Sequence, residues 1–85
     1  MQVNNVMRAL VERSGKSYRQ VSAELGKSAT WASNVAMPTR TPRLDTVADV
    51  ADVAGCDVCI IDRDTGAVVA TVTPPRRAGD GDATA

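Results

Sequence analysis

The chain has no histidine and no phenylalanine, and its aromatic side chains are one tyrosine and one tryptophan. Without histidine it lacks the commonest general base and the commonest metal ligand. No nucleophile stands beside a credible base in the sequence, so we expect a protein that is not an enzyme. Its core must be built from valine, leucine, isoleucine, methionine and alanine.

Cysteine is also scarce, since Cys56 and Cys59 form a single C-x-x-C. A structural zinc ion needs four ligands as a rule, and no second pair is present to complete such a site. A thioredoxin-like redox motif would need a βαβ unit, which the pattern does not indicate. The neighbouring valine and isoleucines favour buried, reduced thiols, and we expect no metal and no other cofactor.

Long apolar runs are missing as well. No stretch approaches the roughly 20 residues of a membrane span, and the N-terminus lacks the basic and apolar regions of a secretory signal. We therefore expect a cytoplasmic protein that does not contact a membrane. A chain of 85 residues is enough for one compact domain with a modest core.

The net charge of zero hides an asymmetry along the chain. Residues 1–44 carry seven Lys and Arg against two Glu, a balance of +5, and residues 45–85 carry three Arg against eight Asp, a balance of −5. Such a split is typical of a basic working face joined to an acidic half. An ordinary mixed surface would give the same counts, so charge alone leaves both interpretations open.

The first two helices are indicated by periodicity and capping. Apolar residues from Val3 to Val11 follow the i, i+3, i+4, i+7 pattern of an amphipathic helix, and Gly15 supplies its C-terminal stop. Ser17 with Gln20 three residues later forms an S-x-x-Q capping box. A second helix is therefore expected to begin at Tyr18.

Two further helices are expected before Gly55. Gly26 breaks the second helix, Ser28 can cap a third helix that Pro38 ends, and Pro42 suits the first turn of a fourth. Five apolar residues mark the inward face of this fourth helix: Leu44, Val47, Val50, Ala51 and Ala54. Its opposite, solvent-facing side is expected to carry Asp45, Asp49 and Asp52.

After Gly55 the apolar period changes to two. Residues 57–63 and 67–73 are rich in Val, Ile and Thr and flank the turn signal Asp64-Thr65-Gly66, which predicts a β-hairpin. Apolar residues fall on both of its faces, Val58, Ile60, Val68 and Val72 on one and Cys59, Ile61 and Val69 on the other.

A lone hairpin is marginal in water, so its second apolar face needs a partner. We expect the hairpin of residues 56–73 to pair with a second copy in a homodimer, through the interface residues Val58, Ile60, Val68, Val69 and Val72. A hairpin that curls over its own helices in a monomer is the alternative. Residues 74–85 have no apolar side chain larger than alanine or proline and are expected to form a disordered, flexible tail.

Several segments together follow a known pattern. Val21-Ser22 stand where an apolar residue and alanine are usual, Leu25-Gly26 match a Leu-Gly turn, and residues 28–35 and 42–51 follow in register. In these positions the chain resembles the Cro/C1-type helix-turn-helix family, the lambda-repressor-like or Xre group of phage and bacterial regulators. It departs from the family at Lys27, which is commonly apolar, and at residues 36–38, which replace a frequent Glu-x-Gly.

The resemblance implies a mostly α fold. Residues 1–55 would form a four-helix, lambda-repressor-like helix-turn-helix DNA-binding domain, with the C-terminal β-hairpin of residues 56–73 in place of the family's fifth helix. The short tail of residues 74–85 would follow it.

The resemblance also implies the site. In this family the third helix enters the DNA major groove, where base edges are read. The positions that would contact bases are Ser28, Ala29, Thr30, Ser33 and Asn34. Asn34 is the most informative of them, because asparagine can bind adenine through two hydrogen bonds. A solvated helix face would have the same composition.

Phosphate contacts would supply most of the affinity and hold the protein in register. The candidates lie at the start of the second helix, in the turn and in the later loop: Arg19, Gln20, Lys27, Arg40 and Arg43. Ordinary solubilising charge is the alternative interpretation for these residues.

We expect a dimeric, sequence-specific transcriptional regulator of phage or mobile-element type, acting as a repressor that reads a palindromic operator in double-stranded DNA. Two alternatives remain open. The chain could be an antitoxin that represses its own promoter and binds a toxin, or a phage-encoded inhibitor of a host defence complex such as a CRISPR system, built on the same fold.

Overall fold

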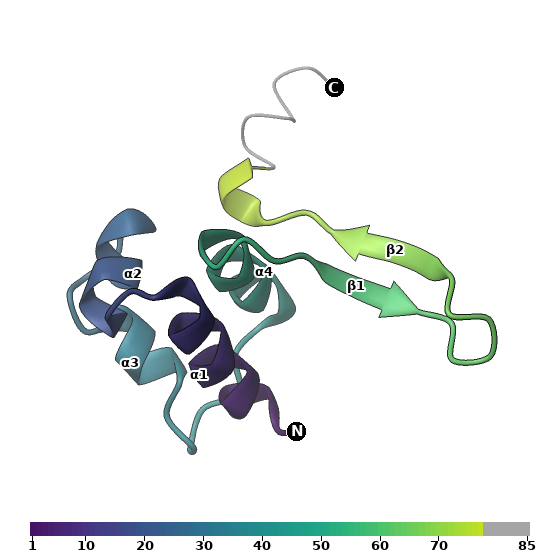
Figure 1. The fold of residues 1–85 in the computed structure, drawn as a ribbon. Helices are drawn as coiled ribbons and strands as arrows, with labels where there is room; N and C mark the ends of the chain where they lie inside the picture. The colour runs from purple at the N-terminus through teal and green to yellow at the C-terminus, as the bar shows by residue number, and fades with distance from the viewer. Residues whose placement is uncertain (78–85) are drawn as a thin grey trace.

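The computed structural model describes residues 1–77, which form four helices followed by an antiparallel two-stranded hairpin (Figure 1). The elements are α1 (Val3–Ser14), α2 (Tyr18–Glu24), α3 (Trp31–Val35), α4 (Leu44–Val53), β1 (Val58–Ile61) and β2 (Val68–Val72). The helices pack together on one side, and the hairpin extends away from them beyond α4 (Figure 1). The expected mostly helical fold with a C-terminal hairpin is confirmed.

A small aliphatic core holds the helices together. Its buried members come from all four helices and from the C-cap residue of α3: Met7, Val11, Val21, Ala32, Ala36, Val47 and Val50. The two aromatic side chains, Tyr18 and Trp31, are only partly buried and pack against the edge of this cluster. A core with two alanines and no large ring lets the short helices α2 and α3 approach closely.

The expected ends of α1 and the start of α2 are confirmed. Gly15 follows α1 with a φ of 71°, in the left-handed region that glycine occupies without strain. At the start of α2 the Gln20 backbone N–H donates to the Ser17 hydroxyl at 3.1 Å. The Ser17 N–H donates in return to Oε1 of Gln20 at 2.8 Å, which completes the capping box.

The beginning of α3 differs from the expectation. Ser28 does not cap it, because the helix starts at Trp31 after a turn and its N-cap residue Thr30 makes no side-chain bond. The cap comes from α2 instead: the Ser22 hydroxyl accepts the Ala32 N–H at 2.9 Å and donates to the Tyr18 carbonyl at 2.9 Å. Ser22 has no exposed surface. A tertiary contact thus satisfies the free N–H group that a local side chain was expected to bind.

The helices α3 and α4 are also shorter than expected. α3 ends at Val35, before Pro38, and α4 begins at Leu44 with Arg43 as its N-cap, so Pro42 precedes the helix. Leu44 was expected to face inward, but 54% of it is exposed, because the buried cluster begins one turn later at Val47.

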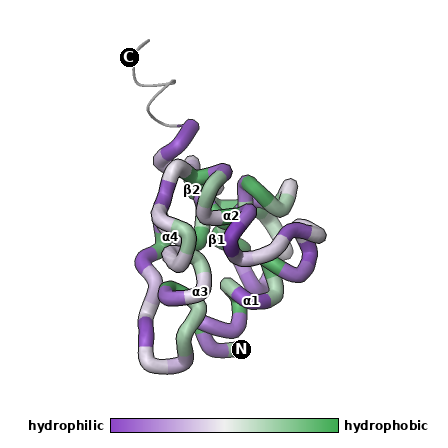
Figure 2. Tube along the Cα trace, turned by 90° about the vertical axis from the view of Figure 1, so that its left-hand side faces the viewer, coloured by the Kyte–Doolittle hydropathy of each residue, from purple (hydrophilic) through white to green (hydrophobic). Residues whose placement is uncertain are grey.

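The acidic side of α4 was expected to face solvent, and this is wrong for Asp49 and Asp52, which the segment after β2 covers. The Arg76 backbone N–H donates to Oδ1 of Asp49 at 3.1 Å, and the Arg77 guanidinium donates to Oδ1 of Asp52 at 3.0 Å. The Arg76 side chain lies 3.4 Å from the other Asp52 oxygen. The described part of the chain ends in this hydrophilic stretch, which is purple in Figure 2.

Residues 74–77 therefore do not behave as the expected disordered tail. Pro74 is buried, and the two arginines that follow it are paired with α4. The composition lacked apolar side chains, but ion pairs and a proline ring make the contact instead. The rest of the expected tail, residues 78–85, lies outside the described residues.

The hairpin has an irregularity that changes which residues share a face. Cys59 pairs with Thr71 and Ile60 with Ala70, but Ile61 pairs with Val68, so Val69 is an extra residue in a β-bulge. The bulge places Val68 with Ile61, not on the side of Ile60 as the simple alternation predicted. The alternation of apolar residues in the sequence does not reveal where a strand carries an extra residue, so it could not predict this bulge.

The base of the hairpin is anchored, whereas its outer part is exposed. Val58 is half-buried and packs against the helical core, and its pair partner Val72 is also half-buried. Towards the turn, Ile60, Ile61, Val68 and Val69 are between 51% and 68% exposed. Of the five expected interface residues, three are exposed: Ile60, Val68 and Val69. The other two, Val58 and Val72, lie at the base of the hairpin.

We expect Ser22→Ala to lower the free energy of unfolding by about 1–3 kcal/mol, because it leaves the buried Ala32 N–H without an acceptor. Urea denaturation followed by circular dichroism measures this. Ser28→Ala is the matched control, since that exposed serine does not cap α3, and it should change stability by less than about 0.5 kcal/mol. A larger loss from Ser28→Ala than from Ser22→Ala would contradict the assigned cap.

Candidate nucleic-acid interface

The surface that the sequence singled out is formed by α2, α3 and the turn between them. Gly26 makes this turn with a φ of 70°, and the Lys27 N–H donates to the Ser22 carbonyl at 2.8 Å. On the buried side of this turn, the Ser22 hydroxyl accepts the Ala32 N–H. Backbone and side-chain bonds of one residue, Ser22, therefore fix both the turn and the start of α3.

The five expected base-contacting residues are brought together on one exposed stretch. Ser28, Ala29, Thr30, Ser33 and Asn34 are all exposed. Only the last two lie within α3, because the first three form the turn before it. The structure thus presents a turn followed by a single helical turn, not the longer helix that was expected.

These polar side chains differ in how free they are. The Ser33 hydroxyl donates to the Thr30 carbonyl at 2.9 Å, so its proton is already used and only its lone pairs remain. Within residues 1–77, no hydrogen bond engages the side-chain amide of Asn34. The amide nitrogen of Asn34 is therefore available as a donor to a ligand, and its amide oxygen as an acceptor.

Two of the expected phosphate contacts lie at the start of α2. Arg19 and Gln20 are both exposed there. The capping box uses the Oε1 atom of Gln20, so its side-chain nitrogen stays free to donate. The cap also fixes the direction of this side chain, which a sequence motif alone could not show.

Lys27 lies in the turn, with its ammonium 5.7 Å from the centre of the Trp31 ring. This distance is within reach of a cation–π interaction, which holds the long side chain beside α3. Trp31 itself is half-buried, so it serves as a support and not as an open stacking surface.

The two arginines of the later loop differ from each other. Arg40 is exposed, and its side chain makes no ion pair with any of residues 1–77. Arg43 lies 3.2 Å from Oδ2 of Asp45, although 84% of its side chain is exposed. The other oxygen of Asp45 is buried without a hydrogen-bond partner among the described residues. Asp45 therefore reduces the positive charge that Arg43 presents.

Carboxylates are absent from residues 25–44, which hold three cations. Of the two carboxylates that border this range, Glu24 is paired with Lys16 and Asp45 with Arg43. The hydrogen bond from the Lys16 ammonium lowers the pKa of Glu24, desolvation opposes it, and the charges of Lys16 and Arg76 make smaller contributions that also lower it. The α2–α3 surface thus carries small polar groups bordered by cations, with no free acid among them.

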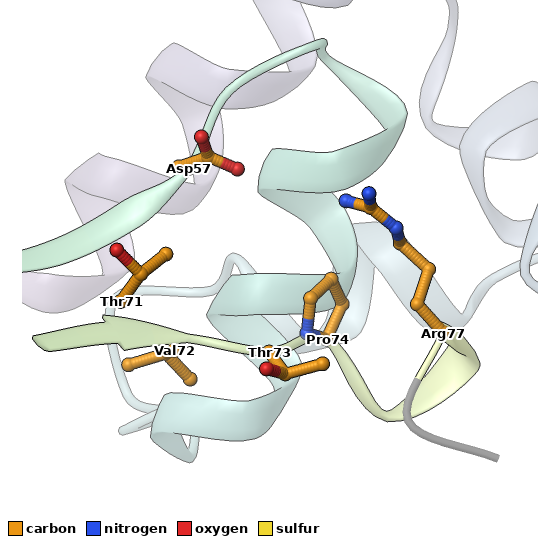
Figure 3. A pocket seen from close by; sticks show the side chains of 6 residues that line it. All are labelled: Asp57, Thr71, Val72, Thr73, Pro74 and Arg77. Carbon is orange, nitrogen blue, oxygen red and sulfur yellow. The ribbon is translucent and has the colours of Figure 1, made fainter. Parts of the chain in front are cut away.

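A second candidate feature lies elsewhere, between the base of the hairpin and the segment that follows it (Figure 3). This open pocket has a volume of about 380 Å³ and is lined by Asp57, Thr71, Val72, Thr73, Pro74 and Arg77. Its one guanidinium is already bonded to Asp52 at 3.0 Å. The pocket therefore offers a ligand no unpaired cation, and its other polar side chains are Asp57, Thr71 and Thr73.

Comparisons of the chain with protein-family models, curated proteins and solved structures each found no match. Within residues 1–77, no helix is long and apolar enough to cross a membrane, and no cluster of His, Cys, Asp or Glu could hold a metal ion. The functional interpretation of the α2–α3 surface therefore depends on its own residues and geometry.

We expect Gly26→Ala to lower the free energy of unfolding by about 1–2 kcal/mol, because alanine is strained in the left-handed conformation. No atom lies within 4 Å of the added Cβ, so backbone strain and not a clash would be the cause. Gly26→Asn is the control, since asparagine tolerates this conformation better and should lose less. Equal losses in thermal unfolding would point away from backbone strain.

Proposed function

We propose that this protein is a sequence-specific DNA-binding transcriptional regulator of the Cro/C1-type helix-turn-helix kind, a dimeric repressor of phage or mobile-element origin. One observation carries the proposal: the α2–α3 surface presents small polar side chains bordered by cations, and its one carboxylate, Glu24, is paired with Lys16. Small side chains let a helix approach base edges in the major groove. The cations around them suit the phosphates that flank the groove.

Each part of the surface has a distinct role in this proposal. The amide of Asn34 would bond to a base edge, with Thr30 and the turn residues beside it. Ser33 would act only as an acceptor, because its proton is used within the helix. Arg19, Lys27 and Arg40 would contact phosphates, as would the free nitrogen of the Gln20 side chain.

The charge of the chain explains why a dimer would be needed. The net charge is zero, so non-specific attraction to DNA is weak. α3 has five residues, and one such contact surface reads few base pairs. Two copies related by a two-fold axis would double the contacts and read a palindromic operator.

A second candidate function is binding of another protein, either as an antitoxin or as an inhibitor of a host defence complex. The exposed aliphatic residues of the hairpin favour it, since Ile60, Ile61, Val68 and Val69 face solvent. The first experiment separates the two candidates. It is a titration of the protein against DNA from upstream of its own coding region, with a scrambled duplex, at two salt concentrations. Equal or absent binding to both duplexes would favour the protein-binding function.

We expect Asn34→Ala to reduce preference for the specific duplex over the scrambled one by about 5–100-fold, as loss of a bidentate base contact does. Arg19→Ala should instead weaken binding to both duplexes alike and reduce the salt slope by about one. Fluorescence anisotropy measures both effects.

Arg13→Ala is the control for charge, because that exposed arginine lies on α1 and is not one of the proposed contact residues. It should leave both affinities nearly unchanged. If Arg13→Ala and Arg19→Ala weakened binding equally, the assigned phosphate contacts would be wrong.

We also expect Asp45→Asn to tighten binding to any duplex about 2–5-fold, because it releases the Arg43 guanidinium that Asp45 now pairs with. Asp64→Asn removes the same charge at the hairpin turn and serves as the control. Titrations at low and moderate salt measure the change. A gain in affinity that is the same for both substitutions would show an effect of net charge and not of Arg43.

A further inference from the structure

The outer edge of β1 has unpaired backbone groups whose direction can be assigned. The Asp62 N–H donates to the Ala67 carbonyl at 2.9 Å, and the Gly66 N–H donates to the Asp62 carbonyl at 2.8 Å. Both backbone groups of Asp62 therefore point towards β2. The direction of the backbone N–H and C=O groups alternates along an antiparallel strand. Those of Ile60 therefore also point towards β2, whereas those of Cys59 and Ile61 point away from it.

The two edges of the hairpin are not equivalent. The bulge at Val69 interrupts the regular spacing along β2, and bulges of this kind discourage further pairing. Pro74, two residues after β2, has no N–H group and is buried. β1 has no such interruption, so it offers the more regular edge.

β1 also lacks the usual protection of an edge strand. Its four residues, Val-Cys-Ile-Ile, include no charge and no proline. Ile60 and Ile61 are 51% and 55% exposed. An edge that is apolar and regular is complementary to another strand of the same kind, and the absence of charge means that two copies meet without repulsion.

The sequence around β1 favours one register for pairing with a second copy. If the two-fold axis passes at Ile60, Cys59 lies opposite Ile61 of the second copy, and the two Ile60 side chains face each other. The backbone groups of Cys59 and Ile61 both point outward. Cys59 of each copy can therefore form a hydrogen-bonded pair with Ile61 of the other copy. An axis at Cys59 would place Asp57 against Ile61, and an axis at Ile61 would place Arg63 against Cys59. The axis at Ile60 sets Val58 against Asp62, but it alone places Asp57 opposite Arg63 of the second copy, a pair of opposite charge.

We propose that β1 pairs antiparallel with β1 of a second copy, about a two-fold axis at Ile60, to form a four-stranded sheet in the order β2-β1-β1-β2. The contact is isologous, as expected for a two-fold dimer. The sequence predicted only that the hairpin forms a dimer, whereas this pairing specifies the strand edge, β1, and the register, centred on Ile60. Its use in placing two α3 helices on an operator rests on the proposed function, whereas the pairing itself does not.

Disulfide trapping tests the edge and the register together. Cys56→Ser and Cys59→Ser provide a background without native thiols, to which Ile60→Cys is added. At the axis the two Cys side chains would form a non-hydrogen-bonded pair with Cα atoms about 4.5 Å apart, within the range of a disulfide. We expect this variant to become a covalent dimer under mild oxidation. Val69→Cys in the same background lies on β2 and is more exposed than Ile60, yet it should remain monomeric on a denaturing gel.

Ile61→Pro tests the edge by equilibrium measurement. It removes an outward N–H that the hairpin itself does not use, and proline is tolerated at sheet edges. Analytical ultracentrifugation should show a dimer for the unaltered protein and at least about a tenfold weaker association for Ile61→Pro. Circular dichroism checks that the variant is folded, and if it is not, the trapping experiment decides alone.

Three outcomes would overturn the pairing. These are a monomer at all concentrations of the unaltered protein, cross-linking of Val69→Cys in place of Ile60→Cys, and efficient cross-linking through Cys59 alone in a Cys56→Ser variant. DNA titration of the same samples separates this proposal from the proposed function. A dimer without sequence preference would reject the function and keep the pairing, and a monomer with sequence preference would do the reverse.

Discussion

The hydroxyl of Ser22 is the contact on which the arrangement of α2 and α3 depends. It is fully buried, donates to the Tyr18 carbonyl within its own helix and accepts the Ala32 N–H at the start of the next helix. A buried N–H without an acceptor is unfavourable by one or more kcal/mol, so the joint has a single well-defined geometry. The exposed residues of the proposed contact surface take their positions from this joint. A five-residue helix with no local cap would have little stability without it.

The second constraint is electrostatic. The acidic residues of α4 bind the arginines after β2, and Glu24, the one carboxylate of the α2–α3 surface, is paired with Lys16. A chain with zero net charge can therefore still present a local surface without an unpaired carboxylate. The exception is Asp45, whose contact with Arg43 lies at the border of that surface. The contacts of Asp49 and Asp52 with the residues after β2 tie the end of the hairpin to α4. They also set where the two strands leave the helical core.

The candidate site was predictable where the signal was local. The capping box of Ser17 and Gln20 and the glycine turn at Gly26 follow from short motifs, because each involves residues only a few positions apart. Exposure of Asn34 also followed from the family pattern. The start of α3 was predicted incorrectly, because Ser28 has the right chemistry for a cap but a buried serine ten residues before Ala32 takes its place. No local pattern distinguishes these two serines.

The sequence by itself determined the kinds and order of the elements: four short helices, then a hairpin whose two strands are apolar on both faces. Periodicity and turn residues act over a few positions and need no knowledge of the rest of the chain. Only the tertiary structure decided that Arg76 and Arg77 cover Asp49 and Asp52, and that the bulge at Val69 leaves β1 with the more regular edge. The arginine contacts join residues 25 and 27 positions apart, and the difference between the two edges depends on one inserted residue. Packing in three dimensions, not local preference, selects both features.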